Sequence, residues 1–287
     1  PRTRTDVVSG AGTVSQSVRR AALCLAALLA SSCGTFGAHP LADAADSLDE
    51  IRSGVLGFRL IAETAGGQEA GFFLRGPFSL PDDGSLPLAD LSYGQIGTDV
   101  QAGYGFVSTG DAAFIEIAGE AYELPSDRVA ALFGAAEPAD EGVFDELHLE
   151  EWVEDPEVSE GPVLDGEPTE EIEGDLHVVV ALNDMLDATG GVGGSDIPPV
   201  EGEDAERLEA AVESARLLVV TDSDGTFRRL EITVDLEADA PAALQEPLKD
   251  LLGVGFKVQM SIDRPNGEVS VEAPLAPRPF EDLVPPG

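Results

Sequence analysis

The chain has 287 residues, of which 43% are hydrophobic, and its 55 acidic residues against 16 basic ones give a formal net charge of −39. A hydrophobic fraction of this size permits a packed core and argues against global disorder. So few cations exclude nucleic acid as a partner, because phosphate contacts need Lys and Arg, and the acidic surface would repel anionic lipid headgroups too.

Residues 19–34 have the layout of a secretory signal. Arg19 and Arg20 precede an apolar run over residues 21–30, and small residues then lead to Cys33. The run is about ten residues, or about 15 Å of helix, which is too short to span a hydrocarbon core of about 30 Å. The sequence LASSC at residues 29–33 resembles the lipobox of bacterial lipoproteins, with serine where Gly or Ala is commoner. The alternative is an ordinary cleaved signal in which Cys33 falls by chance.

We therefore predict a signal peptide with a lipobox at residues 1–33, a tether at 34–40 and a tail at 281–287. The resemblance to lipoproteins implies that Cys33 becomes the new N-terminus and carries diacylglycerol, which would hold the protein on the extracytoplasmic face of the cell membrane. Attachment would come from the acyl chains rather than from a basic patch. Because Cys24 would be removed with the signal and Cys33 acylated, no disulfide, thiolate metal site or cysteine nucleophile is expected.

After the tether, the apolar period predicts first a helix and then strands. Leu41, Ala45, Leu48 and Ile51 recur at helical spacing before Gly54, which is typical of an amphipathic helix with a glycine stop. From residue 55 to residue 124 the period changes to two, and turn signals interrupt it at 66–67, 81–84, 109–111 and 118–120. This pattern predicts an antiparallel meander of five or six strands.

The second half of the chain mixes strands with helices. Helices are predicted at residues 128–133, after a cap at 126–127, and at 147–153, 203–215 and 241–251. Extended segments are predicted at 161–167 and 168–180, joined by a turn at 165–166, and a strand at 175–182 leads into a helix through 185–186. Two strands are predicted around the turn 222–225, followed by a strand at 256–262 and a turn at 265–267. Strands in a run with interspersed helices indicate an α+β protein, with an antiparallel sheet covered on one face by helices.

Period two also assigns side chains to the faces of the predicted sheet. The polar positions that should face water are Arg59, Arg229, Glu231, Lys257 and Gln259. The opposite positions, large and apolar, are the candidate ligand-cavity residues: Leu56, Phe58, Leu60, Phe72, Leu74, Tyr104, Phe106, Leu230, Ile232, Val234, Phe256, Val258 and Met260. Two interpretations remain open: a partly open apolar cavity in a curved sheet, or a core filled by its own side chains.

No motif indicates catalysis or metal binding. His177 lies in an apolar segment where a structural role is expected, and the glycine run 190–194 has neither dinucleotide-binding nor P-loop spacing, so we interpret it as a linker. Residues 222–225 begin like a calcium loop, but Phe227 stands where that loop needs glycine, so a hairpin turn is predicted. We expect no enzyme activity, no cofactor and no metal.

Several stretches together resemble the LolA/LppX-type superfamily, which includes the mycobacterial LprG-like lipoproteins. They are the lipobox, FIEIAGEAYEL at 114–124, WVEDP at 152–156, DGEPT at 165–169 leading to GDLHV at 174–178, the hairpin at 222–230 and Ala273-Pro274. The resemblance covers residues 41–280 as one domain. It implies a curved antiparallel sheet, a half-barrel, covered by helices on its concave side around an apolar cavity. Members of this superfamily bind acyl chains of lipids or lipoproteins and move them across the envelope.

The resemblance thus implies an actinobacterial envelope lipoprotein that binds or carries a lipid or another acylated ligand and has a possible transport partner in the envelope. The alternative function is a structural or sensory interaction module of the envelope whose core is filled by its own side chains. A void of several hundred Å³ would favour the carrier, and a closed core would favour the interaction module.

Overall fold

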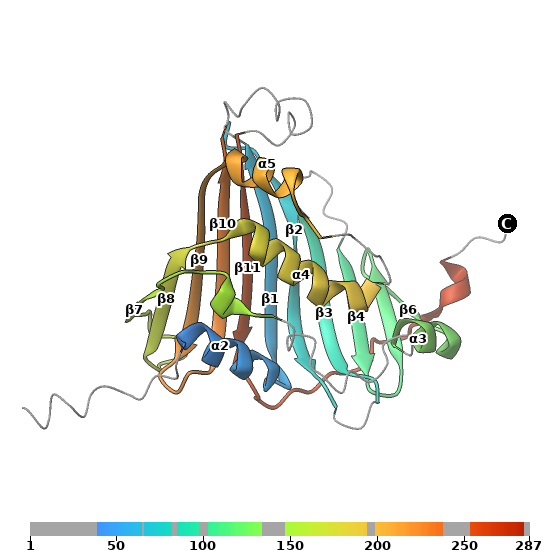
Figure 1. Ribbon diagram of the computed structural model, residues 1–287. Coiled ribbons are helices and arrows are strands. Elements are labelled where there is room, and N and C mark those ends of the chain that lie inside the picture. Colours follow the sequence, from blue (N-terminus) through green and yellow to red (C-terminus); the bar gives the residue numbers. More distant parts are fainter. Residues whose placement is uncertain are drawn as a thin grey trace, which may run out of the picture. The chain divides into compact units, whose positions relative to one another are not determined.

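The computed structural model (Figure 1) describes residues 39–64, 66–81, 85–97, 103–133, 147–193, 199–237 and 253–283. Residues 40–287 form one unit of the chain. The predicted signal, Cys33, most of the tether and the predicted helix at 241–251 lie outside the described residues.

The first element of this unit is the predicted amphipathic helix, α2 (Pro40–Asp49). Its buried residues are Leu41, Ala44, Ala45 and Leu48, which share one side of the helix because they follow its 3.6-residue period. The Ser47 hydroxyl accepts a hydrogen bond from the backbone N–H of Phe227 at 2.9 Å. This bond ties α2 to a strand about 180 residues later in the chain.

The predicted meander is confirmed and contains six strands. They are β1 (Ser53–Thr64), β2 (Glu69–Ser79), β3 (Leu88–Ile96), β4 (Tyr104–Thr109), β5 (Ala113–Ile117) and β6 (Glu120–Glu123). Each strand pairs antiparallel with the next. The helix α3 (Ser126–Phe133) follows, as predicted.

The second half contributes the remaining strands and helices. They are η1 (Leu149–Glu151), β7 (Glu157–Glu160), β8 (Thr169–Asp175), α4 (Val178–Gly193), α5 (Glu203–Ala211), β9 (Val212–Asp222), β10 (Phe227–Leu236), β11 (Val254–Asp263), β12 (Arg278–Pro279) and η2 (Phe280–Asp282). The turns at 165–166 and 222–225 lie where the sequence predicts them, with Gly166 and Gly225 at positive φ.

The strands of the described residues join one 12-stranded sheet in the order β12-β6-β5-β4-β3-β2-β1-β11-β10-β9-β8-β7. The pair β1–β11 connects the meander to the second half of the chain, and Figure 1 shows these two strands side by side near the middle of the sheet. The pairs are antiparallel, apart from the short parallel pair β12–β6 at one edge. The sheet is open, with β12 and β7 as its two edges.

Several predicted elements differ from the structure. The segment predicted as extended at 161–167 follows β7, which ends at Glu160, and holds only an isolated bridge between Leu164 and Glu167. The helix predicted at 147–153 is reduced to the three residues of η1. The run 178–182 is the start of α4 rather than the end of a strand, because β8 ends at Asp175 and Leu176 instead makes an isolated bridge to Val153. Residues 190–193, interpreted as linker, continue that helix. The helix predicted at 203–215 ends at Ala211, since Val212 already begins β9, whose residues 214–218 pair with β10.

The buried core lies between one face of the sheet and the helices. It joins Leu41 and Leu48 of α2, Leu149 and Trp152 at η1, and the strand residues Ile172, Leu217, Val219, Phe227, Leu230, Ile232 and Ile262. Ala181 of α4 is part of the same core, and Ala211 of α5 packs with Leu236 on a second cluster. Helices α2, α4 and α5 therefore all contribute buried residues on this side of the sheet.

Candidate functional site

The strand register divides the side chains between two faces of the sheet, because directly paired residues in an antiparallel sheet point the same way. Phe58 pairs with Leu74 and with Met260, and Met260 pairs with Leu230. Leu230 belongs to the core beneath the helices. We call the face that carries Phe58 and Leu230 the helix-side face, and the other the opposite face.

The register places every candidate cavity residue on the helix-side face. These are Leu56, Phe58 and Leu60 of β1, Phe72 and Leu74 of β2, Tyr104 and Phe106 of β4, Leu230, Ile232 and Val234 of β10, and Phe256, Val258 and Met260 of β11. The polar set Arg59, Arg229, Glu231, Lys257 and Gln259 lies on the opposite face. The structure thus brings the candidate residues together, and their role in binding a ligand stays a prediction.

Burial is uneven along the helix-side face. Leu230 and Ile232, which lie near α2, are only 5% and 4% exposed. The candidate residues of β1, β2 and β11 and Phe106 are half-buried, and Tyr104 is 41% exposed. The apolar face therefore runs from a closed core at β9–β10 to an accessible region at β1–β4.

Aromatic rings form a continuous row across this accessible region. The ring centroids of Phe58 and Phe72 are 5.8 Å apart, those of Phe72 and Tyr93 are also 5.8 Å apart, and those of Tyr93 and Tyr104 are 6.0 Å apart. These separations suit tilted aromatic pairs. The row spans β1 to β4. Tyr93 was absent from the candidate set, although its period-two spacing with Leu91 places it on the same face.

One end of α4 is held by a polar cluster around Asp184. One carboxylate oxygen accepts hydrogen bonds from Trp152 Nε1 at 2.6 Å and from the backbone N–H of His148 at 2.7 Å. The other lies 3.0 Å from His148 Nδ1. The hydrogen bond to Asp184 raises the pKa of the His148 imidazole above its ordinary value, although burial works against the shift. The cluster fixes α4 to the segment before β7.

His177, predicted in an apolar strand, lies at the exposed start of α4. Its backbone N–H donates to Trp152 O at 2.8 Å, and its carbonyl accepts from the N–H of Ala181 at 3.0 Å. The hydrogen bonds described for His177 are therefore made by its backbone rather than by its imidazole.

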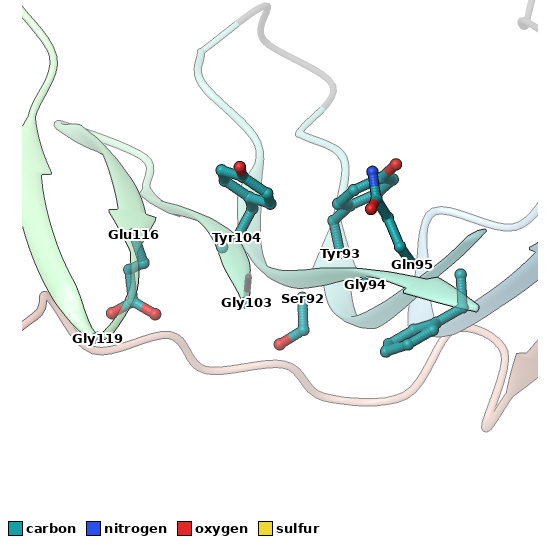
Figure 2. Close-up of a pocket in the computed structure, with 10 residues that line it drawn as sticks. Ser92, Tyr93, Gly94, Gln95, Gly103, Tyr104, Glu116 and Gly119 are labelled. Atoms are coloured by element: carbon teal, nitrogen blue, oxygen red, sulfur yellow. The ribbon is translucent and has the colours of Figure 1, made fainter. Parts of the chain in front are cut away.

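The opposite face carries several pockets. One pocket of about 690 Å³ is lined by Arg59, Arg75, Arg229, Gln259 and Ser261, among others. A second pocket of about 380 Å³ lies over β2–β5 and is lined by Phe73, Ser92, Gly94, Gly105 and Glu116, among others. Figure 2 shows Ser92 and Glu116 on one side of these strands and Tyr93 and Tyr104 on the other.

One ion pair lies beside the first of these pockets, next to its lining residue Gln259. Lys257 Nζ and Gln259 Nε2 both contact the carboxylate of Glu231, the second at 2.7 Å. Burial alone would raise the pKa of Glu231, but these hydrogen bonds hold it below its ordinary value. Glu231 is therefore an anion already engaged by its own neighbours.

The turn at 222–225 is stabilised by the chain's own groups. Asp224 Oδ1 accepts the backbone N–H of Thr226 at 3.1 Å, and the Asp222 carboxylate pairs with the buried Arg228 at 3.0 Å. Within the described ranges, no three His, Cys, Asp or Glu side chains are placed to hold a metal ion. Among the same residues, no helix is long and apolar enough to cross a membrane.

Comparison with known proteins yields structural likenesses but no match by sequence. No family model matches the sequence, and no curated protein matches it. Among solved structures, the crystal structure of LprF from Mycobacterium bovis is similar over 82% of this chain and 95% of that one, with a TM-score of 0.39 and 11% sequence identity.

Proposed function

We propose that the protein is a lipid-anchored envelope lipoprotein that binds an apolar ligand, an acyl chain of a lipid or of an acylated molecule, on the helix-side face of β1–β4. The observation that carries the proposal is the row Phe58, Phe72, Tyr93 and Tyr104, which is apolar, continuous and accessible. A large accessible apolar surface beside a closed core is typical of a binding site, because exposing that surface to water is unfavourable and a bound ligand would cover it. In this proposal the helix-side face is the concave face of a half-barrel.

The arrangement suits an acyl chain for a chemical reason. The four rings and the aliphatic residues around them offer area and dispersion contacts but few hydrogen bonds, so recognition would depend on apolar burial. Each buried methylene contributes about 0.8 kcal/mol, so a chain of fatty-acid length would bind firmly to such a strip. A transport partner in the envelope would load or unload this ligand.

A bulky substitution tests the proposal directly. Val258 is half-buried on the helix-side face of β11, directly opposite Leu60 of β1. Val258→Trp should therefore push a bulky ring into the border of the proposed site while the fold is kept. Thr233→Trp is the matched control, because Thr233 is half-buried on the opposite face of the adjacent strand. Native mass spectrometry and thermal unfolding would be measured on the same samples. We expect co-purified lipid in the parent and in the control, and none in Val258→Trp.

The alternative, an interaction module with a self-filled core, predicts the reverse. The parent would then carry no lipid, and Val258→Trp would unfold the protein, because overpacking a filled core destabilises it. That pair of results would exclude the carrier.

The anchor is tested separately at Cys33. In cells treated with globomycin, which blocks cleavage of lipoprotein signals, the precursor should accumulate, and a Cys33→Ser variant should leave the detergent phase. Normal processing and unchanged membrane association of Cys33→Ser would contradict the anchor without touching the ligand-binding proposal.

A further inference from the structure

The opposite face of the sheet gathers cations in a chain that has few of them. Arg59, Arg75 and Arg229 all line the pocket of about 690 Å³. The whole chain has 16 basic residues against 55 acidic ones. Three arginines in one pocket therefore reverse the local charge of a strongly acidic protein.

The strand register explains how the three side chains reach one place. Gly57 pairs with Arg75 on one side and with Ser261 on the other, and Ser261 pairs with Arg229. Arg75 and Arg229 are thus at the two ends of one row across four strands, about 14 Å apart at the backbone. Arg59 follows Gly57 by two residues on the same face. Between the arginines lie only Gly57 and the small Ser261, so the floor of the pocket is open.

Several other cations of the described structure are already ion-paired. Arg216 pairs with Glu173 at 2.8 Å, Arg228 with Asp222 and Asp165, and Lys257 with Glu231. Arg59 and Arg75 have no ion-pair partner among the described residues. Arg229 lies within electrostatic range of Glu231, but that carboxylate is held by Lys257 and Gln259. Asp263 is the carboxylate that lines this pocket, and it is exposed.

An apolar platform lies directly beside the arginines. Phe73, 37% exposed, lines both the pocket of about 690 Å³ and the pocket of about 380 Å³. Its ring covers Gly94 of β3 so closely that a Cβ at that position would collide with the ring. A ligand held by the arginines would therefore meet a flat aromatic surface next to its anionic group.

We propose that this pocket binds a small organic phosphate ester, with the phosphate on Arg59, Arg75 and Arg229 and the organic group on Phe73. The guanidinium fork donates two parallel hydrogen bonds to phosphate oxygens, which is why arginine recognises this group so well. A compact ligand fits better than a planar anionic membrane, because Glu63, Glu69 and Asp263 lie on the same face around the cluster and would repel a charged surface.

Titration calorimetry with phenyl phosphate at low salt tests the proposal, with inorganic phosphate and phenol as reference probes. We expect saturable binding of phenyl phosphate, weaker binding of phosphate and none of phenol. Arg59→Gln and Arg75→Gln should each raise the Kd for phenyl phosphate about tenfold or more, as expected for loss of a charge-assisted hydrogen bond. Arg216→Gln is the matched control, since it removes the same charge from the same face but from a residue already paired with Glu173. Phe73→Ala should weaken the binding of phenyl phosphate and leave the binding of inorganic phosphate unchanged.

A second variant keeps the test decisive if an arginine variant folds poorly. Ser261→Asp leaves all three arginines in place and puts a carboxylate between them, so phenyl phosphate binding should be lost. The proposal is overturned if the parent does not bind phenyl phosphate, if Ser261→Asp binds as the parent does, or if Arg216→Gln loses as much affinity as Arg59→Gln. Binding to vesicles of phosphatidylglycerol in phosphatidylcholine, without binding of phenyl phosphate, would also overturn it in favour of a membrane-docking surface.

Discussion

The two ends of the helix-side face follow the same period-two pattern but reach different states. At β8–β10 the apolar side chains meet α2 and η1, and Trp152, Leu217 and Phe227 are almost completely buried. At β1–β4 equally large side chains such as Phe58 and Phe72 stay half-buried. The alternation of a strand therefore fixes which face a side chain occupies, but a packing partner decides whether that face becomes a core or a site.

The largest contrast is expected from removing one ring at each end. Phe227→Ala should lower the free energy of unfolding by about 3–5 kcal/mol, because Phe227 is fully buried and its loss leaves a cavity. Phe72→Ala, the matched change at β2, should cost only about 1–2 kcal/mol, because that ring is partly hydrated already. Urea denaturation of delipidated protein measures both. Equal losses would show that the face of β1–β4 is closed core as well.

A smaller effect is expected where α4 is fixed beside the closed end. Asp184→Asn keeps the shape of the side chain but removes the charge that Trp152 Nε1 and the His148 backbone N–H face. A cost of about 1–3 kcal/mol follows from weakening these partly buried bonds. Asp187, three residues further along α4, is exposed, so Asp187→Asn is the control and should change the free energy of unfolding little. Equal free energies of unfolding for the two variants in denaturant titrations would contradict a stabilising role for the Asp184 carboxylate.

The smallest expected effect is a dependence on pH carried by His148. Because the interaction with Asp184 raises its pKa in the folded protein, the protonated imidazole stabilises the fold. This contribution is fully present below the unfolded pKa of histidine, about 6.5, and disappears as the pH rises through the raised folded value. Since the His148 side chain is 55% exposed, the contribution should not exceed about 1 kcal/mol.

His148→Gln should remove this part of the stability profile between pH 6 and pH 8, as measured by thermal unfolding at fixed ionic strength. His177→Gln serves as the reference, because His177 makes its described contacts through its backbone. A profile of His148→Gln that still falls like that of the parent over this range would contradict the assignment.

Local patterns predicted most of the strands but not the fate of every apolar run. Residues 53–123 alternate clearly and contain turn signals, so the six-stranded meander could be predicted. Residues 178–182 form a continuous apolar run, which fits a buried strand or a helix equally well, and the bridge between Val153 and Leu176 that ends β8 is a tertiary contact. The glycines at 190–193 continue α4 against their propensity, which no local rule anticipates.

The candidate site shows the same limit. Period two was sufficient to place all the candidate apolar residues on one face, because register follows from the pattern once one face is known. It could not tell Leu230, which is closed beneath a helix, from Phe58, which is accessible, since burial depends on α2 packing over β9–β10. Nor could it find the arginine pocket, which brings together side chains from β1, β2 and β10 that are up to about 170 positions apart.

Photo-crosslinking with a diazirine-bearing fatty acid tests the central claim most directly, because it reports where an acyl chain lies. After irradiation and digestion, we predict adducts on the helix-side residues of β1–β4, among them Phe58, Phe72, Tyr93 and Tyr104, and their loss when unlabelled fatty acid is added. Adducts confined to the opposite face, or adducts that excess unlabelled fatty acid does not reduce, would contradict the account.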